Sequence, residues 1–248
     1  MTVQSRPQEQ ALLKNQDNNF PDILENYKEI CYNVENARAK YAKSGEDVQI
    51  MAVTKTVEPE KINFAISQGV KLLGENRVQE FVSKKDSYDK SAQVHFIGHL
   101  QTNKVKYIIQ DVSMIQSVDS VKLAEQIDRS AFSHKKIMDV LVEVNVGEEA
   151  TKSGVSYDKC SELIHEISQL ENIRVKGLMA IPPVGCDEGV FEKMHELYLK
   201  IGEMNIKGVS MQTLSMGMSG DYELAIKHGS NLVRIGTKLF GARKYFGG

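Results

Sequence analysis

The feature that most constrains the fold is a regular alternation between short apolar runs and segments of helical periodicity. In the segments between the runs, apolar residues recur at three- and four-residue steps, as on one face of a helix. Strands that alternate with helices in this way pair in parallel within one sheet. The predicted strands are 50–55, 71–76, 94–99, 113–117, 138–145, 175–181, 212–216 and 232–236.

Eight parallel strands either close into a barrel or lie open as a doubly wound sheet. The first strand is not followed by the G-x-G-x-x-G turn that typifies the open dinucleotide-binding sheet, which favours closure. We therefore predict a single-domain (β/α)₈ TIM barrel over 20–248. Helical spacing over 23–41 adds an N-terminal helix, and the polar segment 1–19 is expected to be poorly ordered.

Composition excludes several classes of partner. Lysine and arginine number 31 against 33 acidic residues, a net charge of −2, so no overall field recruits nucleic acid or an anionic membrane. No apolar run approaches the length of a signal peptide core or a membrane span. The three cysteines are widely spaced and predict neither a disulfide framework nor a zinc site. A cytoplasmic protein with a small-molecule ligand is expected.

Lys55 ends the first predicted strand, and in a barrel the residues at the C-terminal ends of strands line the mouth. With a period of two, Met51, Val53 and Lys55 share one strand face. A lysine on the inward face loses hydration, which lowers its pKa and makes the neutral amine available for a Schiff base with a carbonyl ligand. The alternative is an exposed lysine at the start of a loop.

Two short segments after the last two predicted strands, Ser219-Gly220 and Gly236-Thr237, have the composition of a phosphate site. Glycine lets the backbone approach an anion, the hydroxyl groups donate hydrogen bonds, and a following helix supplies unpaired N–H groups. Barrels often bind phosphate at this position. The alternative is structural: Ser219 caps a helix over 222–227 and Gly236 permits close packing.

Arg234 is expected on the inward face of the last strand, next to Lys55, because the first and last strands adjoin in a closed barrel. It could be a structural arginine paired with Glu75 or Glu143. Beside a pyridine nitrogen it would instead donate a hydrogen bond and disfavour ring protonation.

Other polar residues near the predicted mouth are ambiguous. His95 and His99 would lie about 13 Å apart on a strand, too far to share one metal ion, so no metal site is predicted. His99 and Asn76 could bind a ligand or only fill polar space. Met179 could be a ligand contact or plain barrel packing.

Several longer motifs resemble one known family, the YggS/PROSC family of pyridoxal phosphate homeostasis proteins. The resemblance runs in the same order over about 20 to 245. Its motifs are VTKT at 53–56, GENRVQE at 74–80, HFIGHLQTNK at 95–104, GLMAIPP at 177–183, SMGMSGDYELAIKHGSNLVRIGT at 215–237 and LFGAR from 239.

The resemblance implies a fold like the N-terminal barrel of alanine racemase and a cofactor, pyridoxal 5′-phosphate (PLP). It implies a Schiff base on Lys55, with Arg234 facing the pyridine nitrogen. The other cofactor-binding positions that it implies are Ser219, Gly220, Gly236 and Thr237 for the phosphate, and Asn76, His99 and Met179 nearby.

The expected role is to hold and deliver PLP within the cell, with apo PLP-dependent enzymes as possible recipients and a monomer as the expected state. An amino-acid racemase or decarboxylase of the same fold would need a second acid or base opposite the lysine, and the sequence offers no obvious one. A Schiff-base aldolase acting on a sugar phosphate is the other alternative.

Overall fold

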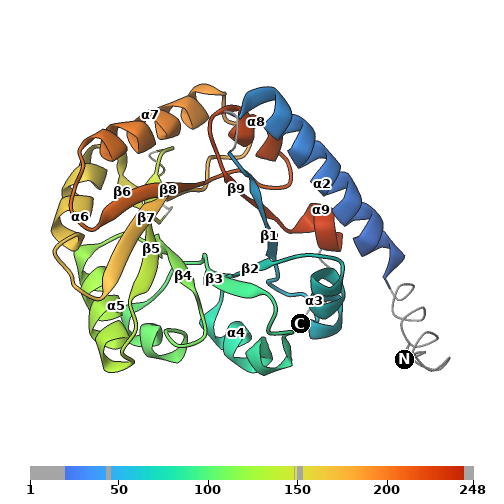
Figure 1. Cartoon of the computed structure of the whole chain (residues 1–248), viewed down its shortest axis with the longest axis horizontal. Helices are drawn as coiled ribbons and strands as arrows, with labels where there is room; N and C mark the ends of the chain where they lie inside the picture. The colour runs from blue at the N-terminus through green and yellow to red at the C-terminus, as the bar shows by residue number, and fades with distance from the viewer. Residues whose placement is uncertain (1–19, 43–45, 148, 150–152, 243–248) are drawn as a thin grey trace, which may run out of the picture.

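The computed structural model describes residues 20–42, 46–147, 149 and 153–242, and the predicted tail over 1–19 lies outside them. Eight parallel strands form a closed ring with helices outside it (Figure 1). Pairing between the fourth and fifth strands closes the ring, which confirms the predicted barrel. The strands are β1 (Gln49–Val53), β2 (Leu72–Glu75), β3 (Gln93–Phe96), β4 (Met114–Val118), β5 (Met138–Asn145), β7 (Ile173–Ala180), β8 (Val209–Ser215) and β9 (Leu232–Ile235).

The N-terminal helix α2 (Pro21–Tyr41) is confirmed and packs against the last two helices of the barrel, as Figure 1 shows. No helix in the described part of the chain is both long enough and apolar enough to cross a membrane. The barrel helices are α3 (Pro59–Ser67), α4 (Val78–Lys84), α5 (Val121–Ser133), α6 (Cys160–Ile167), α7 (Gly189–Glu203), α8 (Tyr222–Lys227) and α9 (Thr237–Phe240).

Two elements differ from the sequence-based prediction. The crossover after β3 is a 3-10 helix, η2 (Thr102–Tyr107), because apolar anchors three and four residues apart are buried in either helix type and do not distinguish them. A ninth strand, β6 (Val155–Ser156), pairs with β5 outside the ring. Two residues are too few to produce a periodic signal.

The barrel strands have two buried faces, which separates the apolar core into two parts. The outward faces pack beneath the helices in one large cluster. Apolar residues that meet inside the ring form a small separate cluster. Its members are Met51, Leu72, Ile97 and Leu232, with Val53 packed against them.

Gly177 in β7 lies at an irregular point in the pairing of β7 with β8. Its φ is +147°, and a Cβ built there would lie 1.8 Å from the carbonyl oxygen of Thr213 on β8. The pairing of β7 with β8 shifts at this position. Only a residue without a side chain allows both the backbone angle and the close approach.

We expect Gly177→Ala to lower the free energy of unfolding by about 2 kcal/mol or more, because strain and overlap add. Denaturant unfolding would measure the change. The control is Gly202→Ala in α7, where the new methyl group would meet only Met211 at 3.7 Å and is expected to stabilise the helix. Equal behaviour of the two variants would contradict the assignment.

Candidate functional site

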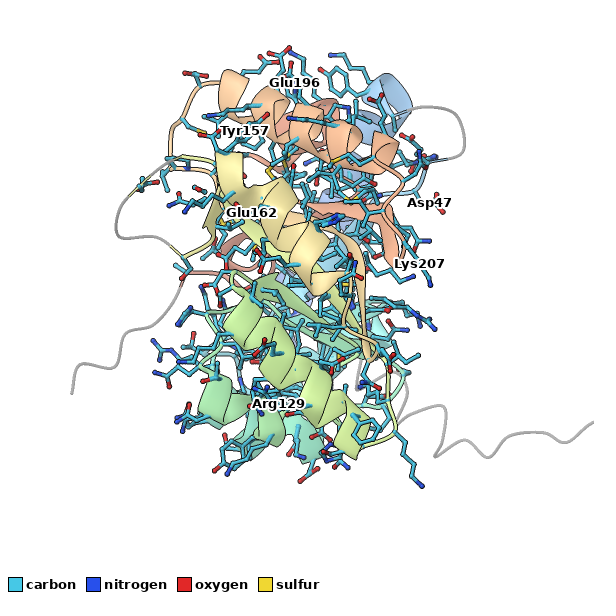
Figure 2. All side chains as sticks on the ribbon, turned by 90° about the vertical axis from the view of Figure 1, so that its left-hand side faces the viewer. Asp47, Arg129, Tyr157, Glu162, Glu196 and Lys207 are labelled. Carbon is cyan, nitrogen blue, oxygen red and sulfur yellow. The ribbon has the colours of Figure 1, made fainter. Side chains whose placement is uncertain are left out.

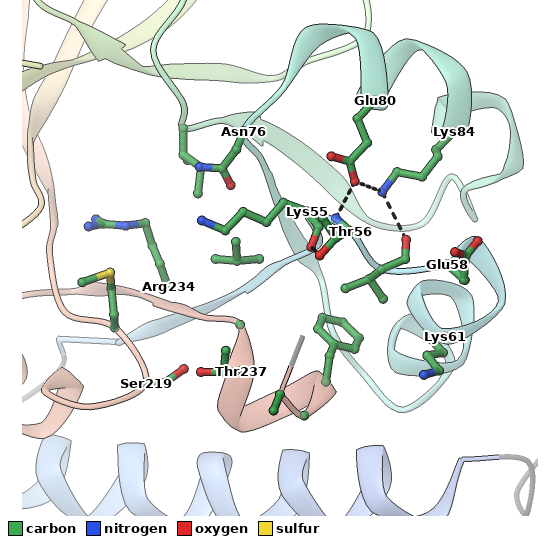
Figure 3. Close-up of a pocket in the computed structure, with 18 of the residues that line it drawn as sticks. Lys55, Thr56, Glu58, Lys61, Asn76, Glu80, Lys84, Ser219, Arg234 and Thr237 are labelled. Atoms are coloured by element: carbon green, nitrogen blue, oxygen red, sulfur yellow. Dashed lines mark hydrogen bonds and ion pairs between the residues drawn. The ribbon is translucent and has the colours of Figure 1, made fainter. Parts of the chain in front are cut away.

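A pocket of about 1140 Å³ opens at the C-terminal ends of the strands, between the end of β1 and the loops after β8 and β9. Lys55 lines one side. Ser219, Gly220, Gly236 and Thr237 line the other. Figure 3 shows the Lys55 side chain extending toward Arg234, while the hydroxyl groups of Ser219 and Thr237 point toward each other. The amine of Lys55 and the two segments that the sequence predicts to bind phosphate therefore line one cavity.

The orientation of Lys55 follows from the pleat of β1. Met51 and Val53 contact the interior cluster, and Lys55 continues their face, where it is half-buried in the pocket wall. Arg234 pairs with Met51 across the junction of β1 and β9 and therefore starts deeper in the barrel than Lys55. Both long side chains line the same pocket.

The loop after β8 has its shape fixed by short-range hydrogen bonds. Asp221 Oδ1 accepts from the Met218 N–H at 2.6 Å. Ser219 Oγ accepts from the Lys238 N–H at 3.2 Å, which ties this loop to the first turn of α9. At Gly220, a Cβ would meet nothing within 4 Å, so this backbone faces open space. Polar groups from two loops therefore converge on one part of the cavity.

The guanidinium of Arg234 is buried and held from two directions. Its Nη1 donates to Ser215 Oγ and its Nη2 to the carbonyl oxygen of Ala180, both at 2.7 Å. Burial lowers its pKa to about 10, while Glu143 and Asp221 act in the opposite direction. Arg234 therefore stays charged at neutral pH, and its edge facing the pocket can donate further hydrogen bonds.

The two alternatives for the structural partner of Arg234 are distinguished by the barrel. Glu75 is on the outward face, where its carboxylate accepts from Thr54 and Tyr88. Glu143 is close enough to influence the charge of Arg234. The buried hydroxyl of Ser215 and the carbonyl of Ala180 make the direct hydrogen bonds.

A chain of polar side chains continues from Arg234 across the barrel. Ser215 Oγ donates to Gln116 Oε1 at 2.8 Å, and Gln116 Nε2 lies 2.9 Å from His95 Nδ1. Burial lowers the pKa of His95 to about 4, so its ring is neutral at physiological pH. Sequence reasoning missed Gln116. The available signal was a pair of polar residues, Gln116 and Ser117, inside a strand that also holds Met114, Ile115 and Val118.

The remaining predicted site residues have different positions. Asn76 lines the pocket, and its buried Oδ1 has no hydrogen-bond partner. Met179 is fully buried in β7 and pairs in register with Glu143 and Ser215. His99 is on the surface, with its side chain 60% exposed and its Nδ1 3.8 Å from Asp119. The pocket lining includes neither Met179 nor His99.

Metal ligation finds no support in the part of the chain that the structure describes. There, no group of three histidine, cysteine, aspartate or glutamate side chains could hold an ion. His95 is buried in the polar chain, whereas His99 is at the exposed rim.

Comparison with known proteins identifies the family. The sequence-family model of the alanine racemase N-terminal domain matches residues 26–244 of this chain. The pyridoxal phosphate homeostasis protein of Aquifex aeolicus is 42% identical over 230 residues, which cover 90% of this chain and all of that protein. This chain belongs to the pyridoxal phosphate homeostasis protein family.

Solved structures support the same assignment. The structure of PipY from Synechococcus elongatus with PLP bound has a TM-score of 0.76 and 28% identity, and covers 88% of this chain and all of that one. An unknown protein from Bifidobacterium adolescentis has a TM-score of 0.84 and 33% identity, over 89% and 95% of the two chains. Membership in the homeostasis protein family agrees with the motifs, because VTKT and the segments at 215–237 meet at the pocket.

Glu143 gives this member of the homeostasis protein family a testable pH dependence. The residue is 5% exposed, and the pKa of its carboxyl group is raised to about 7, first by burial and then by Asp119, with Arg234 offsetting part of the effect. Between its ordinary value of 4.5 and about 7, the unfolded chain releases a proton that the folded chain keeps. The contribution of Glu143 to stability is therefore lost as the pH rises through this window.

We expect Glu143→Gln to gain stability relative to the unsubstituted protein between pH 4.5 and pH 8, by about 3 kcal/mol at most. Unfolding by denaturant across this range would measure the difference. Glu125→Gln, at a 48% exposed side chain on α5, is the control and should give a constant difference. A constant difference for Glu143→Gln as well would show that its carboxyl group titrates normally.

Proposed function

We propose that this protein binds PLP, holds it through a Schiff base on Lys55, and acts in PLP homeostasis or delivery. The observation that carries the proposal is that an inward lysine and two hydroxyl-bearing glycine segments line one cavity. PipY, whose structure contains bound PLP, has the same fold and is 28% identical to this chain. The relative from Aquifex aeolicus, at 42% identity, is named for PLP homeostasis.

The residues of the pocket fit this cofactor. PLP needs an amine for its aldehyde, donors for its phosphate and a polar contact for its ring. Lys55 supplies the amine. Ser219 and Thr237 supply hydroxyl donors beside the open backbone of Gly220. The unpaired buried Oδ1 of Asn76 leaves one acceptor for a ligand group.

The chemistry available depends on the protein groups around the cofactor. When bound, PLP supplies an aldehyde that condenses with amines and a ring that withdraws electrons. Arg234 keeps its charge at neutral pH and donates hydrogen bonds, and as a permanent cation it disfavours a proton on a nearby ring nitrogen. Its buried support from Ser215 and Ala180 keeps the guanidinium in one place. This environment suits storage of the cofactor better than carbanion chemistry.

The wider proposal covers setting and partners. We place the protein in the cytoplasm as a monomer, with one domain over 20–248. Apo PLP-dependent enzymes would receive the cofactor. Nucleic acid and membranes would not be partners, because the net charge of −2 supplies no attraction to either.

Borohydride treatment of the PLP-loaded protein is expected to fix a pyridoxyl group on Lys55, identified by peptide mass spectrometry. Lys55→Ala should lose this adduct yet retain measurable affinity, because the phosphate contacts are a separate source of binding. Lys61→Ala, a lysine on α3 at the outer part of the same pocket, is the control and should keep the adduct. An adduct on another lysine in the unsubstituted protein would overturn the assignment.

A carrier and an enzyme differ in how they treat amino acids. In deuterated water, the loaded protein should exchange the α-proton of an amino acid no faster than free PLP at equal concentration, because Arg234 disfavours the protonated ring. NMR would follow the exchange. Exchange at enzyme-like turnover would favour the racemase or decarboxylase, and a protein that takes up no PLP would favour the aldolase.

A further inference from the structure

The turn that follows Lys55 has an unusual backbone. Thr56 has φ +61°, in the left-handed region that residues other than glycine and asparagine rarely adopt. Its hydroxyl group donates to the carbonyl oxygen of Lys55 at 2.6 Å. A strained residue directly beside a functional side chain persists only when surrounding contacts hold it.

Two side chains of α4 supply those contacts. Glu80 Oε1 accepts from the Thr56 N–H at 2.5 Å. Lys84 Nζ donates to the carbonyl oxygens of Thr54, at 3.2 Å, and Val57, at 3.1 Å. These two carbonyl groups lie on either side of Lys55 and Thr56. The dashed lines in Figure 3 show α4 holding this turn.

Glu80 and Lys84 also bind each other, at 2.7 Å, with side chains that are only 19% and 12% exposed. Burial acts to raise the pKa of Glu80, but hydrogen bonds from Lys84 and Thr56 outweigh it and hold the pKa below its ordinary value. An ammonium group has three N–H donors. Lys84 directs them at Glu80, Thr54 and Val57, so it is engaged in the turn although it lines the pocket.

The residue that precedes this turn, Thr54, is held on the outward face of the barrel. Thr54 Oγ1 donates to Glu75 Oε1, which also accepts from the Tyr88 hydroxyl, both at 2.6 Å. Burial raises the pKa of the Glu75 carboxyl group. Lys55 is therefore the residue between an outward side chain fixed to β2 and a turn fixed to α4. Glu75 and Glu80 both belong to the segment GENRVQE, in which Asn76 is the position that the proposed cofactor contacts explain.

We propose that Glu80 and Lys84 are positioning residues for Lys55, which hold its turn so that the amine meets a carbonyl carbon in the pocket. This inference rests on the proposed function and deepens it. Glu80 and Lys84 affect the formation of the covalent bond to Lys55. The phosphate segments in the loops after β8 and β9 bind the ligand independently of this pair. Loss of the pair lets the turn relax from its left-handed angle and moves the origin of the Lys55 side chain.

The test compares two ligands that differ only at the reacting carbon. PLP carries an aldehyde, whereas pyridoxine 5′-phosphate carries an alcohol and binds without a covalent bond. The ratio of their dissociation constants measures the covalent contribution, and borohydride trapping on Lys55 measures its rate. For Lys84→Met and Glu80→Gln, this ratio and the trapping rate should fall by about tenfold or more. Affinity for pyridoxine 5′-phosphate should stay unchanged.

Two further variants keep the test decisive. Lys85→Met removes the neighbouring lysine, whose side chain pairs with Asp111 away from the turn, and should preserve both ligand affinities. Thr56→Gly removes the strain but keeps the backbone N–H that donates to Glu80. It should fold at least as stably as the unsubstituted protein and retain covalent capture, because glycine adopts this angle freely and Glu80 and Lys84 still hold the turn. Loss of capture in this variant would assign the positioning to the Thr56 side chain and overturn the role of the pair.

The outcomes separate the two proposals. If the unsubstituted protein forms no adduct on Lys55, the proposed function fails. If it forms the adduct and Lys84→Met and Glu80→Gln both retain the full ratio and rate, the positioning role fails alone. Equal losses of affinity for both ligands would show that the pair supports the fold only, which also overturns the inference.

Discussion

The direction in which β1 presents its side chains is the constraint on which the pocket depends. One face of the strand packs inside the barrel through Met51 and Val53, and the other packs beneath the helices through Ala52. A slip of one residue would exchange the two faces. Lys55 would then point into the helical layer, where Thr54 now donates to Glu75. The buried pairings of β1 with β2 and β9 therefore determine where the amine lies.

The barrel interior has to accommodate charge without water. Its apolar cluster includes Met51 and Leu72, while Arg234, which pairs in register with Met51, and Glu143 are buried polar residues of the barrel strands. Burying a guanidinium is costly unless its donors find acceptors, and here hydrogen bonds to Ser215 and the carbonyl of Ala180 engage two of them. The ring of strands brings these acceptors together from β7 and β8, so the polar layer is a product of closure. Figure 2 shows, by contrast, the charged side chains that cover the outside of the helices.

The sequence predicts the barrel well because its signal is repeated. All eight strands of the ring lie within a few residues of the predicted ranges, since fully buried parallel strands form continuous apolar runs. The failures have a common cause. Strand β6 has too few residues for a period, and η2 buries the same anchors as an α-helix would.

The site was predictable to a different extent for each residue. Lys55, Arg234 and the two phosphate segments follow from strand ends and glycine positions, and the structure brings them to one cavity. The support around them was not predictable, because hydrogen bonds such as Ser215 to Gln116 join residues 99 positions apart. No local pattern encodes a contact of that range. The same limit applies to the exposed position of His99, which depends on how the loop after β3 leaves the barrel.

Under the proposed function, the arrangement separates two sources of binding. The amine comes from β1 and is held by α4, whereas the hydroxyl and backbone donors come from the loops after β8 and β9. Among the residues that the structure describes, no hydrogen bond joins Glu80 or Lys84 to Ser219 or Thr237. A reversible covalent bond can therefore break while the phosphate contacts remain, because different elements support each. An enzyme that turns over substrate must also place an acid or base opposite its lysine. The carboxyl group of Glu143 is buried beside Arg234 and does not line the pocket, so it is poorly placed for that task.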